Sequence, residues 1–379
     1  MGAAGRGDDV ATRGLRARRA RREPARARGD RAGGGGLGGG ARGAPPQALQ
    51  RRGGGGRVSG DRLWRLRGRD LALERHAPPA PAGGEVEVRV RAFGVNRADL
   101  LQRAGRYPAP SGAPPDVLGL EFAGEVVRDA HGWRAGDRVA GLCAGGAYAE
   151  RLCAHPRALI PLPASWSWAQ GAALAEAYLT AFDALGAIAD LRAGERVLIH
   201  AIGSGVGVAA AAVAAWMGAE VVGTTRSAWK RDRALGELPA RAVYVVEGGD
   251  LDAVAAAEPE GFHVIIDLVG GSYLEGDVRL LAPRGRVVVV GLLAGAAGQL
   301  PLGALLAKRA SVHGTVLRSR PEEERVALTQ RFCAQVLPAL RRGALAPPAV
   351  EALSALSVEV AHERLARGDV WSQLACVWD

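Results

Sequence analysis

Lysine is nearly absent from this 379-residue sequence, since only Lys230 and Lys308 among its 49 basic residues are lysines. The formal net charge of +10 is also unevenly spread, because residues 1–57 hold 14 Arg and four Asp or Glu. The other 322 residues hold 35 basic and 35 acidic side chains. The part expected to fold is therefore neutral, which argues against a broad basic surface for nucleic acid.

The sequence is also poor in cysteine and in long apolar runs. Its four cysteines are Cys143, Cys153, Cys333 and Cys376, and no two of them form a CxxC pair. They therefore indicate neither a disulfide framework nor a cysteine zinc cluster. The longest apolar run, Val206–Ala219, has 14 residues, fewer than the roughly 20 that cross a bilayer. With no signal-peptide core at the N-terminus, we expect a cytoplasmic protein without a membrane partner.

Residues 1–57 consist mainly of Arg, Gly, Ala and Pro and show no hydrophobic period. Low hydrophobicity and like charge cannot offset the entropy lost on ordering, so we expect a disordered basic tail. Its arginines leave open a mitochondrial transit peptide. Against that alternative, no serine precedes Ser59 and the segment carries four acidic residues.

The region 58–172 shows short strands with turns between them. Alternating apolar and charged residues predict strands at Glu85–Phe93, Glu121–Val127 and Asp137–Leu142. We therefore expect a mostly β domain at residues 58–172. Residues 309–379 should complete it, with a strand at Ser311–Val316 and a helix at Glu322–Leu340.

The region 173–308 instead alternates strands and helices. An apolar strand at Val197–Ala201 precedes an Ala-rich helix at Val206–Met217. Further strands are expected at Glu220–Thr225, Ala242–Val246, His263–Val269 and Arg286–Leu292. Such alternation predicts a doubly wound parallel sheet, and the whole chain is expected to be a two-domain α/β protein.

The strongest single motif is HAIGSGVG (His200–Gly207), which follows a buried strand and opens a helix. Small residues there let the backbone approach a pyrophosphate, whose charge is stabilised at the helix N-terminus. Ile202 and Ser204 replace the first two glycines of a GxGxxG pattern, and only Gly207 keeps its place. The alternative is a glycine-rich turn without a ligand, which the strand–helix setting disfavours.

The end of the next strand selects between the two dinucleotides. An NAD site usually has Asp or Glu there to bind the ribose 2′-hydroxyl, but GTTRSAWK (Gly223–Lys230) contains no acid. Arg226, Ser227 and Lys230 suit a 2′-phosphate instead. The sequence therefore predicts NADPH as the cofactor, with an exposed basic turn as the alternative.

Several separate motifs follow one another in one register over roughly residues 70–370. They are GVNRADLLQRAGRYPAP (Gly94–Pro110), LGLEFAGEVV (Leu118–Val127), AEAYLTAFDAL (Ala175–Leu185), HAIGSGVG, IIDLVGGSYLE (Ile265–Glu275), GLLAG (Gly291–Gly295) and LRSR (Leu317–Arg320). Together they resemble the zinc-free quinone oxidoreductases of the medium-chain dehydrogenase/reductase superfamily. The resemblance implies a GroES-like catalytic domain around a Rossmann domain, usually as a homodimer.

The implied chemistry is direct hydride transfer from NADPH to a quinone or another activated carbonyl compound. The resemblance places Asn96, Asp99 and Tyr107 beside the nicotinamide. Tyr107 then either donates a hydrogen bond to the quinone oxygen or only anchors its loop. Zinc enzymes of the superfamily have Cys at the position of Asn96 and His at that of Leu120, so no metal site is expected.

The residues expected to bind the cofactor lie in five separate segments. They are Phe182, Gly203, Ser204, Gly205, Val206, Gly207, Arg226, Ser227, Lys230, Gly291, Leu292, Leu317 and Arg318. Core packing is an equal alternative for Phe182. Four places depart from the family pattern. VSGDRLWRLRGR (Val58–Arg69) reads poorly as a strand, and Trp371–Leu374 lacks a lysine that can help to hold NADPH. Val245-Val246 replaces an Asn-Tyr pair whose ring can stack on the cofactor, and Ala175 replaces a proline.

Two other functions stay open. Because fold does not fix substrate, the acceptor can equally be an activated enone or an enoyl thioester. Some members of the superfamily are abundant lens proteins or bind RNA, and an Arg-rich tail can bind RNA electrostatically. No aromatic residue precedes Trp64, which disfavours base stacking, so a nucleic-acid partner is not expected.

Overall fold

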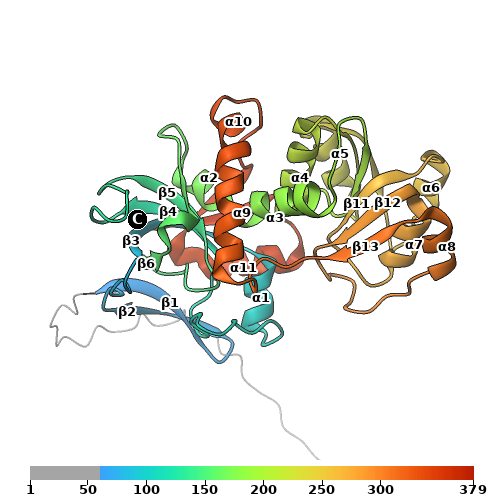
Figure 1. Cartoon of the computed structure of the whole chain (residues 1–379). Coiled ribbons are helices and arrows are strands. Elements are labelled where there is room, and N and C mark those ends of the chain that lie inside the picture. Colours follow the sequence, from blue (N-terminus) through green and yellow to red (C-terminus); the bar gives the residue numbers. More distant parts are fainter. Residues whose placement is uncertain (1–59) are drawn as a thin grey trace, which may run out of the picture. The chain divides into compact units, whose positions relative to one another are not determined.

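The computed structural model describes residues 60–379, and the basic tail predicted at residues 1–57 lies outside that range. Two large sheets and a hairpin organise the described residues (Figure 1). The first large sheet has six parallel strands in the order β10-β9-β8-β11-β12-β13. Their bounds are β8 Arg196–Ile199, β9 Glu220–Thr225, β10 Ala240–Val245, β11 Phe262–Asp267, β12 Leu281–Val289 and β13 Ser311–Gly314.

Counted along the chain, this strand order is the 3-2-1-4-5-6 order of a Rossmann sheet. The predicted doubly wound parallel sheet is therefore confirmed. The order reverses between β8 and β11, and open α/β sheets bind ligands beyond the carboxyl ends of the strands at such a switch point.

The helices of this half connect successive parallel strands. They are α4 Gly205–Trp216, α5 Ala228–Glu237, α6 Asp252–Ala257, α7 Tyr273–Leu280 and α8 Leu302–Lys308. Helix α4 packs against α3 (Ala175–Phe182) as well as β8 and β9, so apolar residues cover nearly all of its surface.

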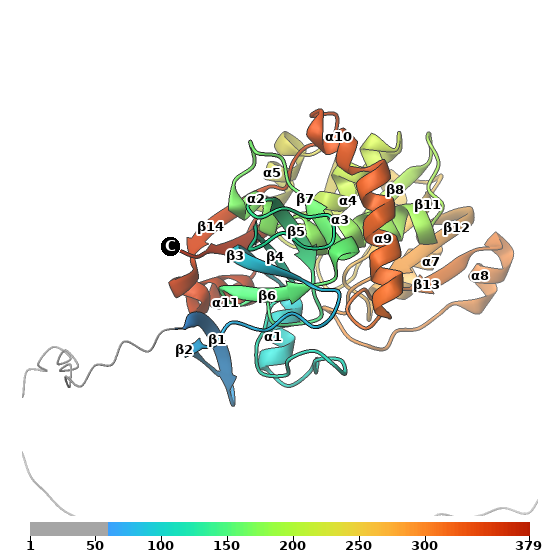
Figure 2. The same cartoon turned by 60° about the vertical axis from the view of Figure 1, so that its left-hand side comes forward.

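The second large sheet has the strand order β14-β15-β3-β4-β5-β7, and β6 also pairs with β3 (Figure 2). The bounds are β3 Val86–Val95, β4 Glu121–Val126, β5 Arg138–Leu142, β6 Arg151–Ala154, β7 Leu159–Pro161, β14 Val350–Ser354 and β15 Gln373–Val377. Strand β15 pairs antiparallel with β3, so the end of the chain lies beside the segment that leads to Asn96.

The remaining helical segments surround this second sheet or join it to the first. The α-helices are α1 Arg97–Arg103, α2 Trp168–Ala172, α9 Glu322–Gln335, α10 Leu337–Arg341 and α11 Val358–Arg367. Two short 3₁₀ segments are Pro156–Ala158 and Ala355–Ser357, and Asp183–Ile188 continues α3 as a π-helix. Helices α3, α4 and α9 share one apolar core with residues of both large sheets.

The interpretation of Val58–Arg69 as a poor strand was wrong. Strand β1 (Asp61–Arg67) pairs antiparallel with β2 (Asp70–His76) along all seven of its residues. No clean alternation is visible in β1 because the adjacent residues Leu63 and Trp64 are both buried, on opposite faces of the strand. Trp64 Nε1 also donates to the carbonyl of Ala355 at 2.8 Å.

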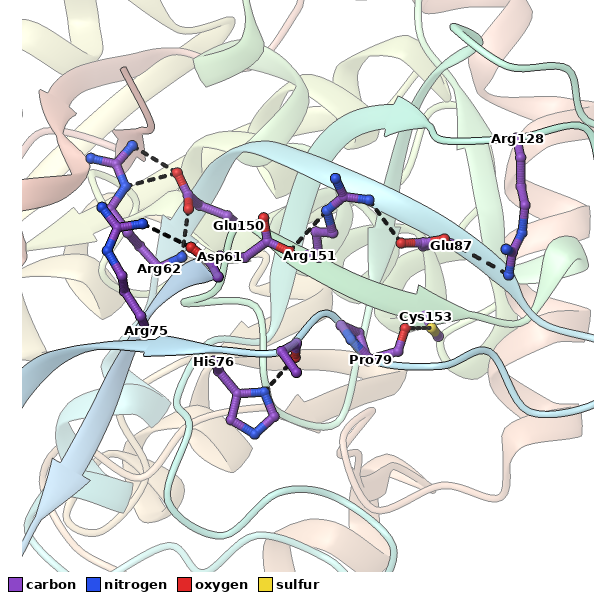
Figure 3. Close-up of polar contacts among 12 residues, drawn as sticks. Asp61, Arg62, Arg75, His76, Pro79, Glu87, Arg128, Glu150, Arg151 and Cys153 are labelled. Atoms are coloured by element: carbon purple, nitrogen blue, oxygen red, sulfur yellow. Dashed lines mark hydrogen bonds and ion pairs between the residues drawn. The ribbon is translucent and has the colours of Figure 1, made fainter. Parts of the chain in front are cut away.

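Ion pairs hold this hairpin on the second sheet (Figure 3). Arg151 of β6 lies 2.9 Å from Asp61 and 2.9 Å from Glu87, and Arg62 pairs with Glu150 at 2.7 Å. Arg62 of β1 therefore has an acidic partner from a distant segment, which the local sequence does not reveal.

Two further expectations need correction. Strand β13 pairs with β12, so Ser311–Gly314 belongs to the parallel sheet and not to the domain assigned to residues 309–379. Strand β13 joins the parallel sheet because it pairs in parallel register with the otherwise open edge of β12. The helix expected over Glu322–Leu340 divides into α9 and α10, since Pro338 in the first turn of α10 has no N–H to continue the ladder.

Candidate functional site

The glycine-rich turn joins β8 to α4 at the switch point of the parallel sheet. Ser204 is the N-cap of α4, and its Oγ accepts a hydrogen bond from Gly207 N at 3.2 Å. A Cβ on Gly207 would lie 2.5 Å from the carbonyl oxygen of Ala201, so only glycine fits there. Within residues 60–379, the amide of Val206 has no acceptor, whereas that of Gly205 faces the Ser372 carbonyl across an isolated parallel bridge between Ser204 and Ser372. The Val206 amide at the N-terminus of α4 fits an anionic group such as a pyrophosphate.

The loop after β12 lies at the same edge of the sheet. Gly291 passes so close to β11 that a Cβ there would lie 2.5 Å from the carbonyl oxygen of Leu268. The neighbouring Leu292 is 57% exposed and contacts Gly270. Both residues predicted from this loop therefore lie at the carboxyl ends of the strands, where a dinucleotide would run.

Strand β9 ends at Thr225, directly before the predicted phosphate-binding residues Arg226 and Ser227. Ser227 occupies the N-cap position of α5. Lys230, in the first turn of α5, lays its alkyl chain against the glycine-rich turn, since a Cβ on Gly203 would lie 3.1 Å from Lys230 Cδ. The structure thus brings together two motifs that the sequence could only place separately.

A third cation, Arg97 at the start of α1, joins this group. Burial lowers the pKa of Lys230, and the charges of Arg226 and Arg97 lower it further. Burial and the charge of Arg226 also lower the pKa of Arg97. In the part of the chain that the structure describes, none of the three forms an ion pair with a carboxylate. The one acid that favours the charged form of Lys230 is Asp369, which pairs with Arg367 at 3.3 Å.

Sequence reasoning missed Arg97 because nothing in GVNRADL distinguishes it from a solvated helix residue. Its proximity to Arg226 and Lys230 depends on the contact between the two halves of the chain. Three converging cations without a paired acid form a site for a multiply charged anion.

Asn96 is the N-cap of α1 and lies at the other side of the candidate site. Its backbone N–H donates to Asp99 Oδ2 at 2.8 Å, and its Nδ2 donates to Glu121 Oε1 at 2.9 Å. The reciprocal cap fixes the start of the helix, and the Glu121 bond fixes the side chain. Asn96 is therefore held in one orientation by residues of α1 and β4.

Asp99 is 1% exposed, and protein donors surround its carboxylate. In addition to the Asn96 amide, it accepts from Gly119 N at 3.1 Å and from the Tyr148 hydroxyl at 3.1 Å. Burial raises the pKa of Asp99 to about 6, although these hydrogen bonds oppose the rise. With its acceptor sites occupied by protein donors, Asp99 is suited to hold Asn96 in place.

Two further carboxyl groups lie beside Asn96, and the sequence reading assigned them no role in the site. Burial raises the pKa of Glu121 to about 8, against hydrogen bonds from Asn96 and from the Glu176 amide. Burial and the charge of Asp99 raise the pKa of Glu176 to about 7. Within residues 60–379, Glu176 Oε2 is buried without a hydrogen-bond partner. Both carboxyls can therefore exchange a proton near neutral pH.

Tyr107 is half-buried, and the guanidinium of Arg318 lies 5.1 Å from the centre of its ring. Burial raises the pKa of the Tyr107 hydroxyl, Arg318 opposes this, and the charge of Glu176 adds to it. No hydrogen bond of that hydroxyl is found in the described residues. Tyr107 therefore has a protonated hydroxyl available near Glu176.

Arg318 is 4% exposed, and its Nε donates to the carbonyl of Ala144 at 2.8 Å. Its NH2 donates to the side chain of Gln102 in α1. Arg318 therefore supports the Tyr107 loop. These contacts are more direct than the contact with the cofactor that was predicted for Arg318. Leu317 is 4% exposed and belongs to the apolar core.

The cofactor role expected for Phe182 does not fit its position. Phe182 is 3% exposed, and its ring lies 6.0 Å from that of Phe332 in α9. It lines a cavity with Trp216 and Met217, at the C-terminal end of α4, whereas the glycine-rich turn is at the N-terminal end. A helix of 12 residues is about 18 Å long, so Phe182 serves core packing.

The segment Trp371–Gln373 covers the glycine-rich turn. Ser372 N donates to the carbonyl of Gly203 at 3.0 Å, and a Cβ on Gly203 would lie 2.8 Å from the Trp371 ring. The sequence reading noted only that this segment lacks a lysine. The one signal in the sequence was that an aromatic and a polar residue replace a glycine and a lysine of the family pattern here. Such a replacement alters any contact of this segment with the turn.

Comparison with known proteins assigns the chain to a family. The model described as the alcohol dehydrogenase GroES-like domain matches residues 82–164, and the zinc-binding dehydrogenase model matches residues 205–331. A quinone oxidoreductase from Mus musculus is 31% identical over 303 residues, which cover 76% of this chain and 88% of that protein. The chain belongs to the quinone oxidoreductase family of the medium-chain dehydrogenase/reductase superfamily.

Membership in this family makes the chain an oxidoreductase with a GroES-like domain and a Rossmann domain, as the motifs predicted. A solved quinone oxidoreductase from Pseudomonas syringae has 27% sequence identity and a TM-score of 0.73, covering 84% of this chain and 99% of that one. Superfamily members of this kind use NAD(P)H as their hydride donor.

Polyketide synthases are also similar to this chain. The pikromycin polyketide synthase component PikAII of Streptomyces venezuelae is 37% identical over 248 residues, or 60% of this chain. The match covers only 6% of that synthase, so the chain corresponds to a small part of it.

Among residues 60–379, no group of three or more His, Cys, Asp or Glu is arranged to hold a metal ion. None of the helices in this part of the chain combines the length and the hydropathy needed to cross a bilayer.

Proposed function

We propose that this family member is an NADPH-dependent quinone reductase that works without zinc. The observation that carries the proposal is the group of Arg97, Arg226 and Lys230, which has no paired acid in residues 60–379 and lies beside the glycine-rich turn. A 2′-phosphate supplies the missing negative charge, whereas the 2′-hydroxyl of NADH does not.

The residues of the turn fit the rest of a dinucleotide. The free amide of Val206 would hold the pyrophosphate, and Arg226, Ser227 and Lys230 would hold the 2′-phosphate, with Arg97 as an additional cation. When bound, NADPH supplies a hydride, and the protein has to hold the two rings at close range.

On the substrate side, we assign the contact with the quinone to Tyr107 and Asn96. The Tyr107 hydroxyl is free to donate to the quinone oxygen as negative charge develops there. The proton that completes the hydroquinone has a nearby source in the Glu176 carboxyl, whose pKa of about 7 leaves it partly protonated at neutral pH. Asp99 acts as a positioning residue that holds Asn96.

The test is a titration of the purified chain with NADPH and with NADH, followed by cofactor fluorescence and by turnover of an ortho-quinone. We expect NADPH to bind at least about tenfold more tightly than NADH. The double variant R226A/K230A should abolish that preference while leaving NADH binding within about twofold. The control R231A removes an exposed arginine of α5 that pairs with Asp232, and it should change the binding of neither dinucleotide. Equal losses for both dinucleotides would refute the assignment.

A second candidate is reduction of an activated enone or an enoyl thioester by the same cofactor. The 37% identity with a segment of a polyketide synthase favours it. The same Tyr107 hydroxyl would then stabilise the enolate oxygen. Comparing kcat/KM for ortho-quinones, enones and enoyl thioesters separates the two candidates, since a preference of more than about tenfold identifies the better transition-state fit.

A homodimer and a cytoplasmic location stay predictions from the sequence and its family. Sedimentation of the full chain and its localisation in cells would test them.

A further inference from the structure

Gln373 lies where the glycine-rich turn meets the substrate side of the site. It is the first residue of β15, is 6% exposed and follows Ser372, which has a left-handed φ of 60°. The hydrogen bond from Ser372 N to Gly203 docks this part of the chain on the turn. The position of Gln373 is thus set from both sides, by the β15–β3 ladder and by the turn.

Both hydrogens of the Gln373 amide have acceptors. Nε2 donates to Asn96 Oδ1 at 2.9 Å and to Glu121 Oε1 at 2.7 Å. Because Asn96 Nδ2 donates to the same Glu121 oxygen, the three side chains form a closed triangle. Turning either amide over would bring two donors or two acceptors face to face, so the triangle allows one orientation of Asn96.

The remaining oxygen of Gln373 faces the cofactor side. A Cβ on Gly205 would lie 2.0 Å from Gln373 Oε1, so this oxygen contacts the first residue of α4. No donor to it is found in the described residues. An amide oxygen without a donor in such a confined place fits a hydroxyl group of a ligand on the turn.

We infer that Gln373 is a positioning residue that links cofactor binding to Asn96. Its amide nitrogen orients Asn96, and its Oε1 accepts a hydrogen bond from a sugar hydroxyl of the dinucleotide at the glycine-rich turn. The inference rests on the dinucleotide-dependent function proposed above. One rigid side chain then sets the position of the cofactor and of the Asn96 amide together, which is the positioning that hydride transfer requires.

The variant Gln373→Leu removes the donor and the acceptor with little change in volume. We expect kcat for ortho-quinone reduction with NADPH to fall about 10–100-fold, because a small misplacement of reacting groups has effects of this order. The Kd for NADPH should rise about threefold to tenfold. The matched control Gln330→Leu removes an exposed glutamine of α9 that donates to the Arg157 carbonyl at 2.6 Å, and it should leave both values unchanged.

A double-mutant cycle separates positioning from a purely structural role. If Gln373 acts through Asn96, the double variant N96A/Q373L should have nearly the same kcat as N96A alone. Urea unfolding of each variant shows whether it is folded, and Gln373→Met takes the place of the leucine variant if that one is not. Effects on kcat that multiply would overturn the link to Asn96.

The outcomes also separate this inference from the proposed function. A wild-type chain that binds and uses NADPH while Q373L stays within about twofold of it in kcat and Kd overturns the role of Gln373 alone. A wild-type chain that binds neither NADPH nor NADH overturns both.

Discussion

His200 Nε2 lies 2.7 Å from Asp277 Oδ1, and both side chains are completely buried beneath the glycine-rich turn. His200 Nδ1 also bonds Thr224 Oγ1 at 2.7 Å, so the pair connects β8, β9 and α7. Burial opposes protonation of His200, but Asp277 outweighs it and raises the pKa of the imidazole. The pair therefore fixes the strand ends on which the candidate cofactor site is built.

Breaking this pair should cost much of the stability of the fold. Because Asp277→Ala leaves a buried imidazole without its acceptor, we expect a loss of about 3–5 kcal/mol in the free energy of unfolding. The control Asp232→Ala breaks a surface pair on α5 and should cost less than about 1 kcal/mol. Urea denaturation at pH 7 measures both, and similar small losses would show that the buried pair is not structural.

The close packing of the glycine-rich turn should make an added methyl group costly at Gly207. Gly207→Ala puts a Cβ 2.5 Å from a backbone carbonyl, which cannot move aside, and should destabilise the protein by about 1–3 kcal/mol. Gly186→Ala meets only the ring of Phe182 at 3.6 Å, an ordinary contact. Because this control sits in a helical segment, it should be neutral or stabilising by up to about 1 kcal/mol. Thermal unfolding of the two variants checks the contrast, and equal melting temperatures would contradict it.

The pH dependence of stability should report on Glu176. Burial raises its pKa from 4.5 to about 7, so the folded chain binds this proton more tightly than the unfolded chain. The stabilisation is full below pH 4.5 and is lost as the pH rises through about 7. Between pH 5 and 8, wild type should lose roughly 1–3 kcal/mol that Glu176→Gln does not lose.

Urea unfolding at both pH values gives that difference directly. The control Glu275→Gln changes an exposed carboxylate of α7 and should leave the wild-type pH dependence in place. If E176Q retains the full pH dependence, the group responsible is another buried carboxyl, for which Glu121, with a pKa of about 8, is the next to replace.

Arg97 should contribute to NADPH binding although it lies outside the Rossmann domain. Arg97→Ala removes one of the two arginine charges that lower the pKa of Lys230, and the Kd for NADPH should rise about tenfold. Binding of NADH should change less than about twofold, because it has no 2′-phosphate. The control Arg89→Ala removes an exposed arginine of β3. Fluorescence titration in low salt measures the Kd values of the wild type and of the two variants. An equal effect of Arg97→Ala on both dinucleotides would assign Arg97 to another role.

Local sequence pattern was enough to predict several elements. Strand β9 begins and ends at the predicted residues Glu220 and Thr225. Helix α4 lies within one residue of its predicted bounds, because its burial leaves a nearly continuous apolar run. The glycine-rich turn and the cations after β9 were equally visible, since their residues are adjacent in the chain. The family followed from several such motifs in order.

The contacts between residues far apart in the chain depend on how the segments pack. Gln373 and Asn96 are 277 positions apart and share a hydrogen bond only because β15 pairs with β3. Arg97 joins Arg226 and Lys230 because the two halves of the chain pack together, and Phe182 lies at the far end of α4 from the turn. A side chain's partners and its desolvation arise from packing between segments, which local periodicity does not encode.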